Sequence, residues 1–586
     1  MNRVPMRLLL LAAATLLTRV ATELRISETL STTGPGTQSV QCDDVASAFS
    51  EDIFEEPAEI SCSLLQTSMT ELKGRGPSQQ LQKPAGQFMM TKPTNSSRGA
   101  GRPVLQDKAS GIYKAPVHHA RTHAALLTPF VLLMIASVAW YMASRSKDYL
   151  DPSCSDVPIA IDGENPGSAA NVQSGWGQLS PSAFVLTMFV ECVAPGLLSM
   201  AYTMKYVGYC YGLLMLLFLY GISVSTMWAV GRTAEITSEY TYAGQWKAAV
   251  GEHSVWFPLL MVIGTSYGNL VTYAMDWADI FTTMFARAAG YDMPRWVNLV
   301  CFTLFPTLPL CLLKRFPDLK LTNALAAAAI FFTTFAVCFR HADGSYLAGG
   351  QFYAQVPEEP HIPKHTHIFY LESRSFACLN TLGTAFLCHY NGCKYYRELH
   401  AHEPGRFCRL TALAMGLGVV VYAIFGIFSH HTFGWVASGM VLENYSPYDG
   451  LINIARVGMG LSLIFVFPIG FNGLRENAIS FMRIQYPTWA RNLDIVWKQD
   501  MLSIALCLFT TGSAVILTEN GMVTGIVGAF GGGTTICFIP AVLILAAMSR
   551  FRGSEGHTKL RVSMTCIAIL GVLYTVGACL GLVFKA

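Results

Sequence analysis

The feature that most constrains this chain is a series of apolar runs, each close to the length that a helix needs to cross a bilayer. A transmembrane helix requires about 20 predominantly apolar residues. Hydrophobic residues make up 52% of the 586-residue chain and charged residues only 13%, whereas a soluble domain carries about 25% charged residues. The composition excludes a soluble globular domain and predicts an all-α membrane protein with many spans.

Twelve apolar runs are long enough to span. The first, at 124–143, is separated from the others by a polar linker at 144–180. The remaining eleven form a core over 182–584. We place their spans at 182–203, 206–230, 255–276, 296–313, 319–339, 374–392, 408–429, 451–471, 500–517, 521–548 and 562–584.

The residues before the first run are predicted to lie outside the helical core. Residues 1–21 combine a basic start with a short apolar segment, which is typical of a signal peptide or a signal-anchor. Residues 22–120 are rich in Ser, Thr, Gly, Pro and Gln without lasting periodicity, so we expect them to be disordered. Asn95 begins a glycosylation sequon in this region, and Asn444 begins another in the core, which predicts a glycoprotein if both are lumenal.

The distribution of positive charge orients the core in the membrane. Seventeen Lys and Arg residues fall in the loops after the second, fourth, sixth, eighth and tenth core spans, and six fall in the intervening loops. Because Lys and Arg gather in cytoplasmic loops, the core is predicted to start in the cytoplasm and to end outside. The run at 124–143 then crosses from outside to inside, and both sequons fall outside.

The first core span carries a break signal at Ala194, Pro195 and Gly196. Pro removes a backbone donor and Gly relaxes the backbone, while the flanking residues from Thr187 to Lys205 favour helix. Lipid cannot satisfy the backbone groups that a break exposes, so such breaks are tolerated where they line a cavity that can hold a small charged solute. A Pro kink in an ordinary packed helix is the alternative.

The sixth core span carries a second break signal. Its run at 388–392 is polar and ends in Gly392. Interruptions in the first and sixth spans indicate two five-span halves of opposite orientation, and inverted repeats with a site at their interface are a transporter design. The halves have no visible sequence self-similarity, so the repeat is inferred from topology. We expect the two interrupted helices to meet at a water-reachable pocket near mid-membrane.

Several stretches of the core match one known family in order and spacing. They lie at 196–208, 308–325, 385–391, 396–399, 433–434 and 467–471. In these stretches the chain resembles the amino acid/auxin permease family, within the amino acid–polyamine–organocation superfamily. The first stretch looks closest to the sodium-coupled neutral amino acid branch. The resemblance covers about 178–584 and does not extend to 1–177.

The resemblance implies a LeuT-like fold, that is, a 5+5 inverted-repeat core with eleven spans, preceded in this chain by one extra N-terminal transmembrane helix. It also implies secondary transport of amino acids, with the substrate's carboxylate and amine presented to the two broken spans. Carried over by position, the substrate contacts are Ala194, Pro195, Gly196, Leu197, Phe386, His389 and Asn391. Pro195 departs from the family pattern because it cannot donate an N–H to the carboxylate.

Two neighbouring positions bear on the coupling ion. The Asn that helps to bind sodium in the sodium-coupled branch aligns with Val190, which disfavours sodium coupling. Glu191 follows it deep in the span, where a central charge costs about 2.5–3.5 kcal/mol on insertion scales. Burial favours the protonated form of a carboxyl group, so we predict that Glu191 carries a coupling proton. A neutral, hydrogen-bonded acid, or an ion pair with Arg456, is the alternative.

Other polar residues have a structural interpretation that competes with the functional one. His389 could gate or relay protons, or pack as a hydrogen-bonded core residue. Arg456 lies near the outer end of the eighth span, where it could snorkel to water. Asp276 and Asp279 close the third span, and we expect them to meet water. The glycines at 531–533 favour close helix packing over a phosphate loop, because no Lys-Ser/Thr follows them.

The sequence predicts no metal or cofactor, no enzyme activity and no nucleic-acid partner. The His groups at 118–123 and 361–367 match no tetrahedral ligand spacing. Nuclease, kinase and hydrolase motifs are absent from the sequence. The predicted partners are an amino acid substrate, a coupling proton rather than sodium, and the lipid bilayer.

Together these features predict a multi-pass transporter that moves amino acids by rocking one helix bundle against another. We expect it in the plasma membrane or in a vacuolar or lysosomal-type endomembrane. The alternatives are an endomembrane exporter or uniporter, and a non-transporting amino acid sensor that signals through 1–120. Deleting 1–120 would distinguish them, because a transporter should keep its flux whereas a sensor should lose partner binding.

Overall fold

The computed structural model describes residues 177–288, 292–356, 380–551 and 558–583. Within them, nine helices are long and apolar enough to cross a membrane, and a shorter apolar helix covers Arg295–Cys311. The predicted signal segment, the polar N-terminal region and the predicted span at 124–143 lie outside the described residues, as does the first part of the predicted sixth core span. In its described part the chain is an all-helical membrane protein.

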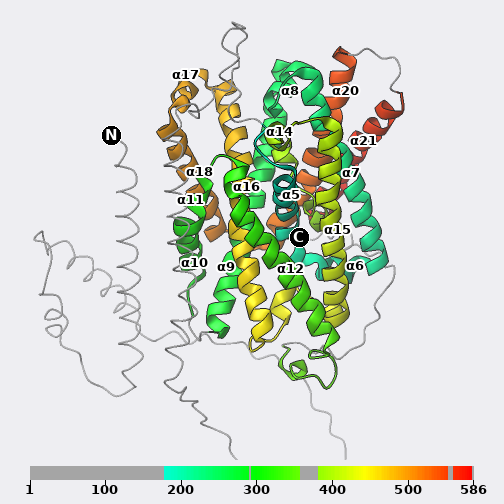
Figure 1. The fold of residues 1–586 in the computed structure, drawn as a ribbon, viewed down its shortest axis with the longest axis vertical. Coiled ribbons are helices and arrows are strands. Elements are labelled where there is room, and N and C mark those ends of the chain that lie inside the picture. The colour runs from blue at the N-terminus through cyan, green and yellow to red at the C-terminus, as the bar shows by residue number, and fades with distance from the viewer. Residues whose placement is uncertain (1–176, 289–291, 357–379, 552–557, 584–586) are drawn as a thin grey trace, which may run out of the picture. The chain divides into compact units, whose positions relative to one another are not determined.

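The long helices begin within a few residues of the predicted spans (Figure 1). They are α7 (Tyr209–Thr237), α9 (Trp256–Ala288), α12 (Lys320–Ala342), α15 (Pro404–Phe433), α16 (Gly450–Gln485), α18 (Val496–Ile516) and α21 (Thr558–Val583). Short helices also occur in the connections and in the sixth span, namely α8 (Tyr242–Ala249), α14 (Gly392–Glu398) and α17 (Pro487–Ala490).

Three further spans each consist of two helices joined by a turn of different pitch. In the first span, α5 (Pro181–Gly196) and α6 (Met200–Val207) flank a 3-10 turn. The other two spans contain π-helical segments, which often mark functional sites. Their parts are α10 (Arg295–Phe302) and α11 (Leu308–Cys311) around Thr303–Thr307, and α19 (Asn520–Phe530) and α20 (Ile539–Phe551) around Gly531–Phe538.

Local sequence signals determine where two central spans start. Ser180 caps α5 by accepting a hydrogen bond from the N–H of Ala183 at 3.3 Å, and Pro occupies the first helical position, where no N–H is needed. The Asp449 carboxylate caps α16 by accepting from the N–H groups of Leu451 and Ile452. These caps satisfy backbone donors that a helix start leaves unpaired.

Helix α9 continues to Ala288, well beyond its predicted end at 276. The expectation that Asp276 meets water is wrong, because this residue is 7% exposed and accepts a hydrogen bond from the Asn520 amide of α19. Asp279 forms an ion pair with Arg295 at 2.5 Å. Protein groups therefore replace water around Asp276, whereas the side chain of Asp279 remains 31% exposed.

The interrupted first span lies in the interior of the helix assembly. Helix α5 packs against α12, α15 and α16, and α16 packs in turn against α9 and α12 (Figure 1). Of the most apolar stretch of this span, 78% is buried by protein, against 17% for α21. The first span is thus surrounded by other helices, whereas most residues of α21 are not buried by the rest of the protein.

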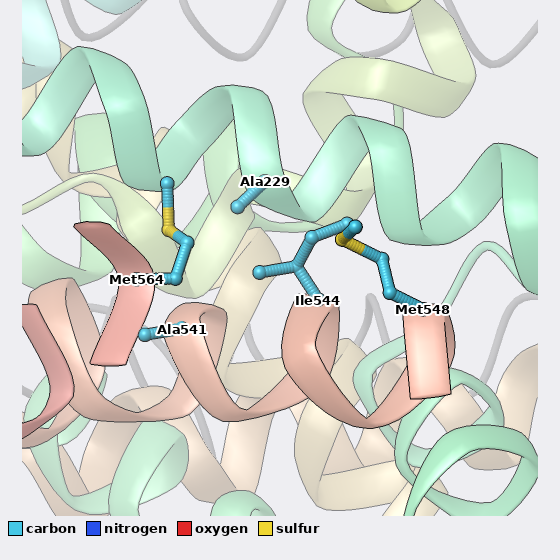
Figure 2. Packing of buried hydrophobic residues seen from close by; sticks show 5 residues of the cluster. All are labelled: Ala229, Ala541, Ile544, Met548 and Met564. Atoms are coloured by element: carbon cyan, nitrogen blue, oxygen red, sulfur yellow. The ribbon is translucent and has the colours of Figure 1, made fainter. Parts of the chain in front are cut away.

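Small and flexible apolar side chains join α7, α20 and α21. Figure 2 shows Ala229 of α7 beside Ala541, Ile544 and Met548 of α20 and Met564 of α21, all at most 3% exposed. Lipid tails are as apolar as these side chains, so the contact depends on close van der Waals packing rather than on the hydrophobic effect.

The glycines of the π-helical segment bring α21 still closer. A Cβ atom built on Gly533 would lie 2.5 Å from the carbonyl oxygen of Gly571, which is too close for any side chain. The sequence prediction that these glycines serve close helix packing is confirmed at this position.

Candidate substrate and coupling site

The first break is a single tightened turn after Pro195. This proline lies inside α5 and has no N–H, so the carbonyl of Glu191 loses its helical donor. The chain remains helical to Gly196, forms one 3-10 turn from Leu197 and resumes as α6. Ala194, Gly196 and Leu197 are buried, and Pro195 is partly buried. The break is therefore a local change of pitch enclosed by protein.

The second break is wider. Residues 380–384 are helical, residues 385–388 are not, and the 3-10 turn His389–Asn391 leads into α14. Within the break, the N–H of Cys388 donates to the carbonyl of Phe386 at 3.0 Å. The interruption begins three residues before the polar run at 388–392 that the sequence indicates, so Phe386 lies within it.

The two broken spans meet at Glu191. Its Oε1 accepts a hydrogen bond from Nδ2 of Asn391 at 2.6 Å, and its Oε2 accepts one from the hydroxyl of Tyr395 at 2.5 Å. Asn391 and Tyr395 both belong to the sixth span, and Glu191 is 1% exposed. Nδ2 of Asn391 also donates to the carbonyl of Ile469 in α16 at 2.9 Å. A buried carboxyl group thus links three spans.

Arg456 is not the partner of Glu191. Its guanidinium donates instead to the carbonyls of Leu442 and Tyr445, at 2.7 and 2.8 Å, in the loop that precedes α16. At 4% exposed it does not snorkel to water either. The partners of Glu191 are therefore the hydrogen-bond donors Asn391 and Tyr395 rather than this arginine.

His389 and Phe386 both contact α7. Nε2 of His389 lies 3.0 Å from the hydroxyl of Thr226 and 3.3 Å from the carbonyl of Ser223, both on α7. This is the environment of a hydrogen-bonded core histidine. The ring of Phe386 packs near that of Tyr220 of α7, with centroids 6.4 Å apart. Both predicted site residues thus connect the second break to α7.

Helix α15 contributes a tyrosine that touches both breaks. The hydroxyl of Tyr422 donates to the carbonyl of Cys192 in α5 at 2.6 Å and lies 3.2 Å from the carbonyl of Ala385 in the second break. Its side chain lies against Gly196, where a Cβ atom would come within 2.6 Å of the hydroxyl oxygen. The side chain of Tyr422 therefore occupies part of the space between the two breaks, where the sequence predicts a water-reachable pocket.

A crevice reaches the second break from the end of the molecule that the charge distribution places in the cytoplasm. It is narrow and partly open to solvent. Asn391 forms part of its wall, so the crevice ends next to the partner of Glu191. The other lining residues are Tyr240, Thr241, Tyr242, Tyr390, Cys393, Lys394, Gly473, Glu476, Asn477 and Ser480.

Ion pairs hold α14 against α16 beside this crevice. Glu476 of α16 accepts from the ammonium of Lys394 at 2.6 Å and from the guanidinium of Arg397 at 3.1 Å. Lys394 also donates to the carbonyl of Lys314, at 2.7 Å. We call Lys394, Arg397 and Glu476 the cytoplasmic latch.

The chain just before the first span pairs with the end of the sixth. The N–H of Leu179 donates to the carbonyl of Glu398 at 2.8 Å, and the N–H of His400 donates to the carbonyl of Leu179 at 3.0 Å. A third bond runs from the N–H of Gly177 to the carbonyl of Arg397 at 3.3 Å. This short parallel pairing joins the two broken spans at the ends that the charge distribution places in the cytoplasm.

Sequence reasoning missed Tyr395 and Tyr422. Tyr395 lies four residues after Asn391, and residues at this spacing share one face of a helix, so the spacing alone could have paired it with Glu191. Tyr422 had no such signal, because its partners are backbone carbonyls of distant segments. The predicted His groups at 118–123 and 361–367 lie outside the described residues.

The arrangement of interrupted apolar helices around a buried carboxyl group is that of a membrane transporter, and comparison with known families agrees. A family model described as "Transmembrane amino acid transporter protein" matches residues 177–584. The chain belongs to this family of transmembrane amino acid transporters. It is therefore a multi-pass membrane protein of a family whose members are named as transporters rather than as enzymes.

Curated relatives share between a fifth and a quarter of their residues with this chain. A bovine protein with the provisional name sodium-coupled neutral amino acid transporter 11 is 22% identical over 68% of this chain and 82% of its own length. Vacuolar amino acid transporter 5 of Schizosaccharomyces pombe is 25% identical over 56% of this chain and 76% of its own. Amino acid transporter AVT6A of Arabidopsis thaliana is 24% identical over 66% of this chain and 86% of its own length.

Solved structures align with this chain at low sequence identity. MhsT in complex with L-phenylalanine gives a TM-score of 0.45 at 14% identity, covering 67% of this chain and 98% of that one. A Na⁺-coupled sialic acid symporter gives a TM-score of 0.47 at 11% identity, covering 78% of this chain and 97% of that one.

Proposed function

We propose that this protein is a proton-coupled secondary transporter of amino acids that works by alternating access around the two broken spans. The observation that carries the proposal is the contact of Glu191 with Asn391 and Tyr395, which places one buried carboxyl group at the junction of both breaks. In this proposal the breaks bind the substrate through the residues assigned above from the family resemblance, and Glu191 carries the proton.

The contacts of Glu191 suggest how a proton and a conformational change are coupled. Burial favours the protonated acid, whereas two hydrogen-bond donors favour the carboxylate. Both donors belong to the sixth span, so any movement of that span relative to α5 removes them. Loss of the donors favours proton uptake, and re-closure favours release. Proton binding and span movement then bias each other, as coupling requires.

The packing also suggests what moves. The cytoplasmic latch and the pairing of Leu179 with residues 398–400 close the site at one end. The crevice lies directly beside the latch and reaches Asn391. Release of the latch would widen this crevice toward Glu191, which is the opening that an inward-facing state needs. We infer two five-span halves of opposite orientation as the frame for this movement.

A Glu191→Gln variant tests the coupling ion. Wild-type protein in proteoliposomes should take up radiolabelled amino acids faster when an inward proton gradient is imposed, and an inward sodium gradient should add little. Glutamine keeps the size and the hydrogen-bonding acceptor but cannot titrate. We expect the rate of proton-gradient-driven uptake to fall at least tenfold in Glu191→Gln. The variant should still exchange substrate across the membrane.

Asp276→Asn is the matched control. Asp276 is also a buried acid that accepts a hydrogen bond from an amide, but it lies on α9 beside Asn520. Its replacement should leave the response to a proton gradient intact. Proton-driven uptake that survives in Glu191→Gln would contradict the role of Glu191. Uptake driven by sodium alone would favour the coupling that the bovine relative's name states.

A further inference from the structure

Tyr422 has no role in the proposed mechanism, yet it is the residue of α15 that contacts both breaks. Its hydroxyl lies within hydrogen-bond distance of the carbonyls of Cys192 and Ala385, at 2.6 and 3.2 Å. A hydroxyl has one hydrogen, so it donates fully to one carbonyl and leaves the other short of a donor. Two buried carbonyls that converge on one point suit a donor with several hydrogens.

The packing of α15 fixes this hydroxyl at the breaks. Gly418, one turn before Tyr422, lies against Val193 of α5, where a Cβ atom would be 3.1 Å from the valine side chain. Gly426, one turn after it, lies against α6, where a Cβ atom would be 2.6 Å from Met204. Residues four apart share a helix face, so the two glycines direct Tyr422 at the turn between α5 and α6.

The tyrosine also lies against two residues assigned to the substrate. Its hydroxyl oxygen occupies the space beside Gly196 that a Cβ atom would enter. Its ring meets that of Phe386 edge to face, with centroids 6.2 Å apart. Tyr422 is fully buried. The side chain therefore stands inside the candidate site rather than at its border.

We propose that the Tyr422 hydroxyl occupies the position of the substrate's ammonium group while the site is empty, so that an incoming amino acid must displace it. This inference rests on the proposed function, because it takes the two breaks as the amino acid site. An ammonium group carries three hydrogens, can bond to both carbonyls at once, and forms charge-assisted bonds that are stronger than those of a neutral hydroxyl. Tyr422 then lowers affinity for amino acids, whose ammonium group must displace the hydroxyl, whereas a solute without an ammonium group does not compete with the hydroxyl.

Tyr422→Phe tests the proposal, because it removes the competing hydroxyl and keeps the ring. Each of the twenty standard amino acids is supplied radiolabelled to proteoliposomes, and KM is measured for the best substrate. We expect KM to fall about two- to tenfold, as expected for the loss of one net hydrogen bond from the empty site. The deaminated analogue of the same substrate, used as an inhibitor, should not gain affinity, since it lacks the group that replaces the hydroxyl.

Tyr220→Phe is the matched control. Tyr220 also lies beside Phe386, but its hydroxyl donates to the carbonyl of Ala412 in α15 at 3.1 Å, away from both breaks. The KM of the Tyr220→Phe variant should equal that of the wild type. A KM for Tyr422→Phe that is unchanged or higher would overturn the proposal and leave the proposed function standing. Absence of uptake by the wild type for every amino acid would instead count against the function itself.

A second pair of variants keeps the proposal testable if Tyr422→Phe alone folds poorly. Gly196→Ala brings a Cβ atom within 2.6 Å of the Tyr422 oxygen, whereas the nearest ring carbons lie at 3.3 and 3.4 Å. The single variant should lose most of its uptake, and the double variant with Tyr422→Phe should recover it. Wild-type uptake in Gly196→Ala, or no recovery in the double variant, would show that the hydroxyl does not occupy this space.

Discussion

At the scale of single residues, the buried guanidinium of Arg456 is an example of a charge that the fold surrounds with hydrogen-bond acceptors. It donates to the carbonyls of Leu442, Tyr445 and Ser446 and also to Oδ1 of Asn453. A buried cation without partners would be very costly, and the planar guanidinium offers five N–H donors in fixed directions to meet several carbonyls at once. Arg456 thus stabilises the loop in front of α16.

Arg456→Met is therefore expected to destabilise the protein by about 3 kcal/mol, because several carbonyls of one loop lose their donor together. The thermal unfolding midpoint of the detergent-purified protein, followed by intrinsic fluorescence, should fall by several degrees. Arg550→Met, at an exposed arginine at the end of α20, should leave the midpoint unchanged. Equal midpoints for both variants would mean that the loop does not depend on Arg456.

At the scale of elements, the cytoplasmic latch couples α14 to α16. Glu476 forms ion pairs with both Lys394 and Arg397, so one carboxylate binds two cations of the same short helix. The side chain of Lys394 is 3% exposed. Water therefore screens this pair poorly, and its loss should matter more than that of an exposed surface pair.

Glu476→Gln should shift the protein toward a state open to the cytoplasm. Cys393 lines the crevice and is 6% exposed, so its thiol reports this opening. We expect a membrane-impermeant maleimide added to the cytoplasmic face to label Cys393 about tenfold faster in the variant, which corresponds to a shift of about 1.4 kcal/mol. Peptide mapping by mass spectrometry identifies the labelled cysteine.

Glu252→Gln is the control for this measurement. Glu252 pairs with Lys247 at 2.9 Å, but its side chain is 68% exposed. Such a pair contributes little to stability, so the labelling rate of Cys393 should not change. An unchanged rate in Glu476→Gln as well would indicate that the latch does not control access to the crevice.

At the scale of the whole molecule, the excess of Lys and Arg in alternate loops predicts the orientation of the core. Glu403 lies in the loop between α14 and α15, and Tyr448 lies before α16 with 78% of its surface exposed. In sealed vesicles, Glu403→Cys should be labelled only from the cytoplasmic face and Tyr448→Cys only from the opposite face. Labelling of both positions from one face, or in the reverse sense, would contradict the orientation.

The positions of the spans could be predicted because a bilayer demands apolar runs of a narrow length range. Their ends could not be predicted as well. The sequence shows a charged residue at Asp276 but not the Asn520 amide that donates a hydrogen bond to it. The predicted third span therefore stops too early. Pro306 signals the interruption at Thr303–Thr307 through its missing N–H, but its π-helical pitch depends on how neighbouring helices pack.

The candidate site was accessible to sequence reasoning only in part. Glu191 stands out because an acid in mid-span is costly, and Pro195 signals the first break through its missing N–H. That the break is one tightened turn, and that Arg456 stays with its own loop, depends on tertiary contacts. Tyr422 could not be found at all, because it binds carbonyl groups that every residue carries.

The parallel pairing of residues 177–179 with 397–400 has a mechanical consequence. Three backbone hydrogen bonds connect the chain that enters the first span to the end of the sixth. Backbone bonds of this kind do not depend on side-chain identity, so they act as a tether of fixed length. A displacement of the chain at Gly177 would therefore be transmitted to both interrupted spans together.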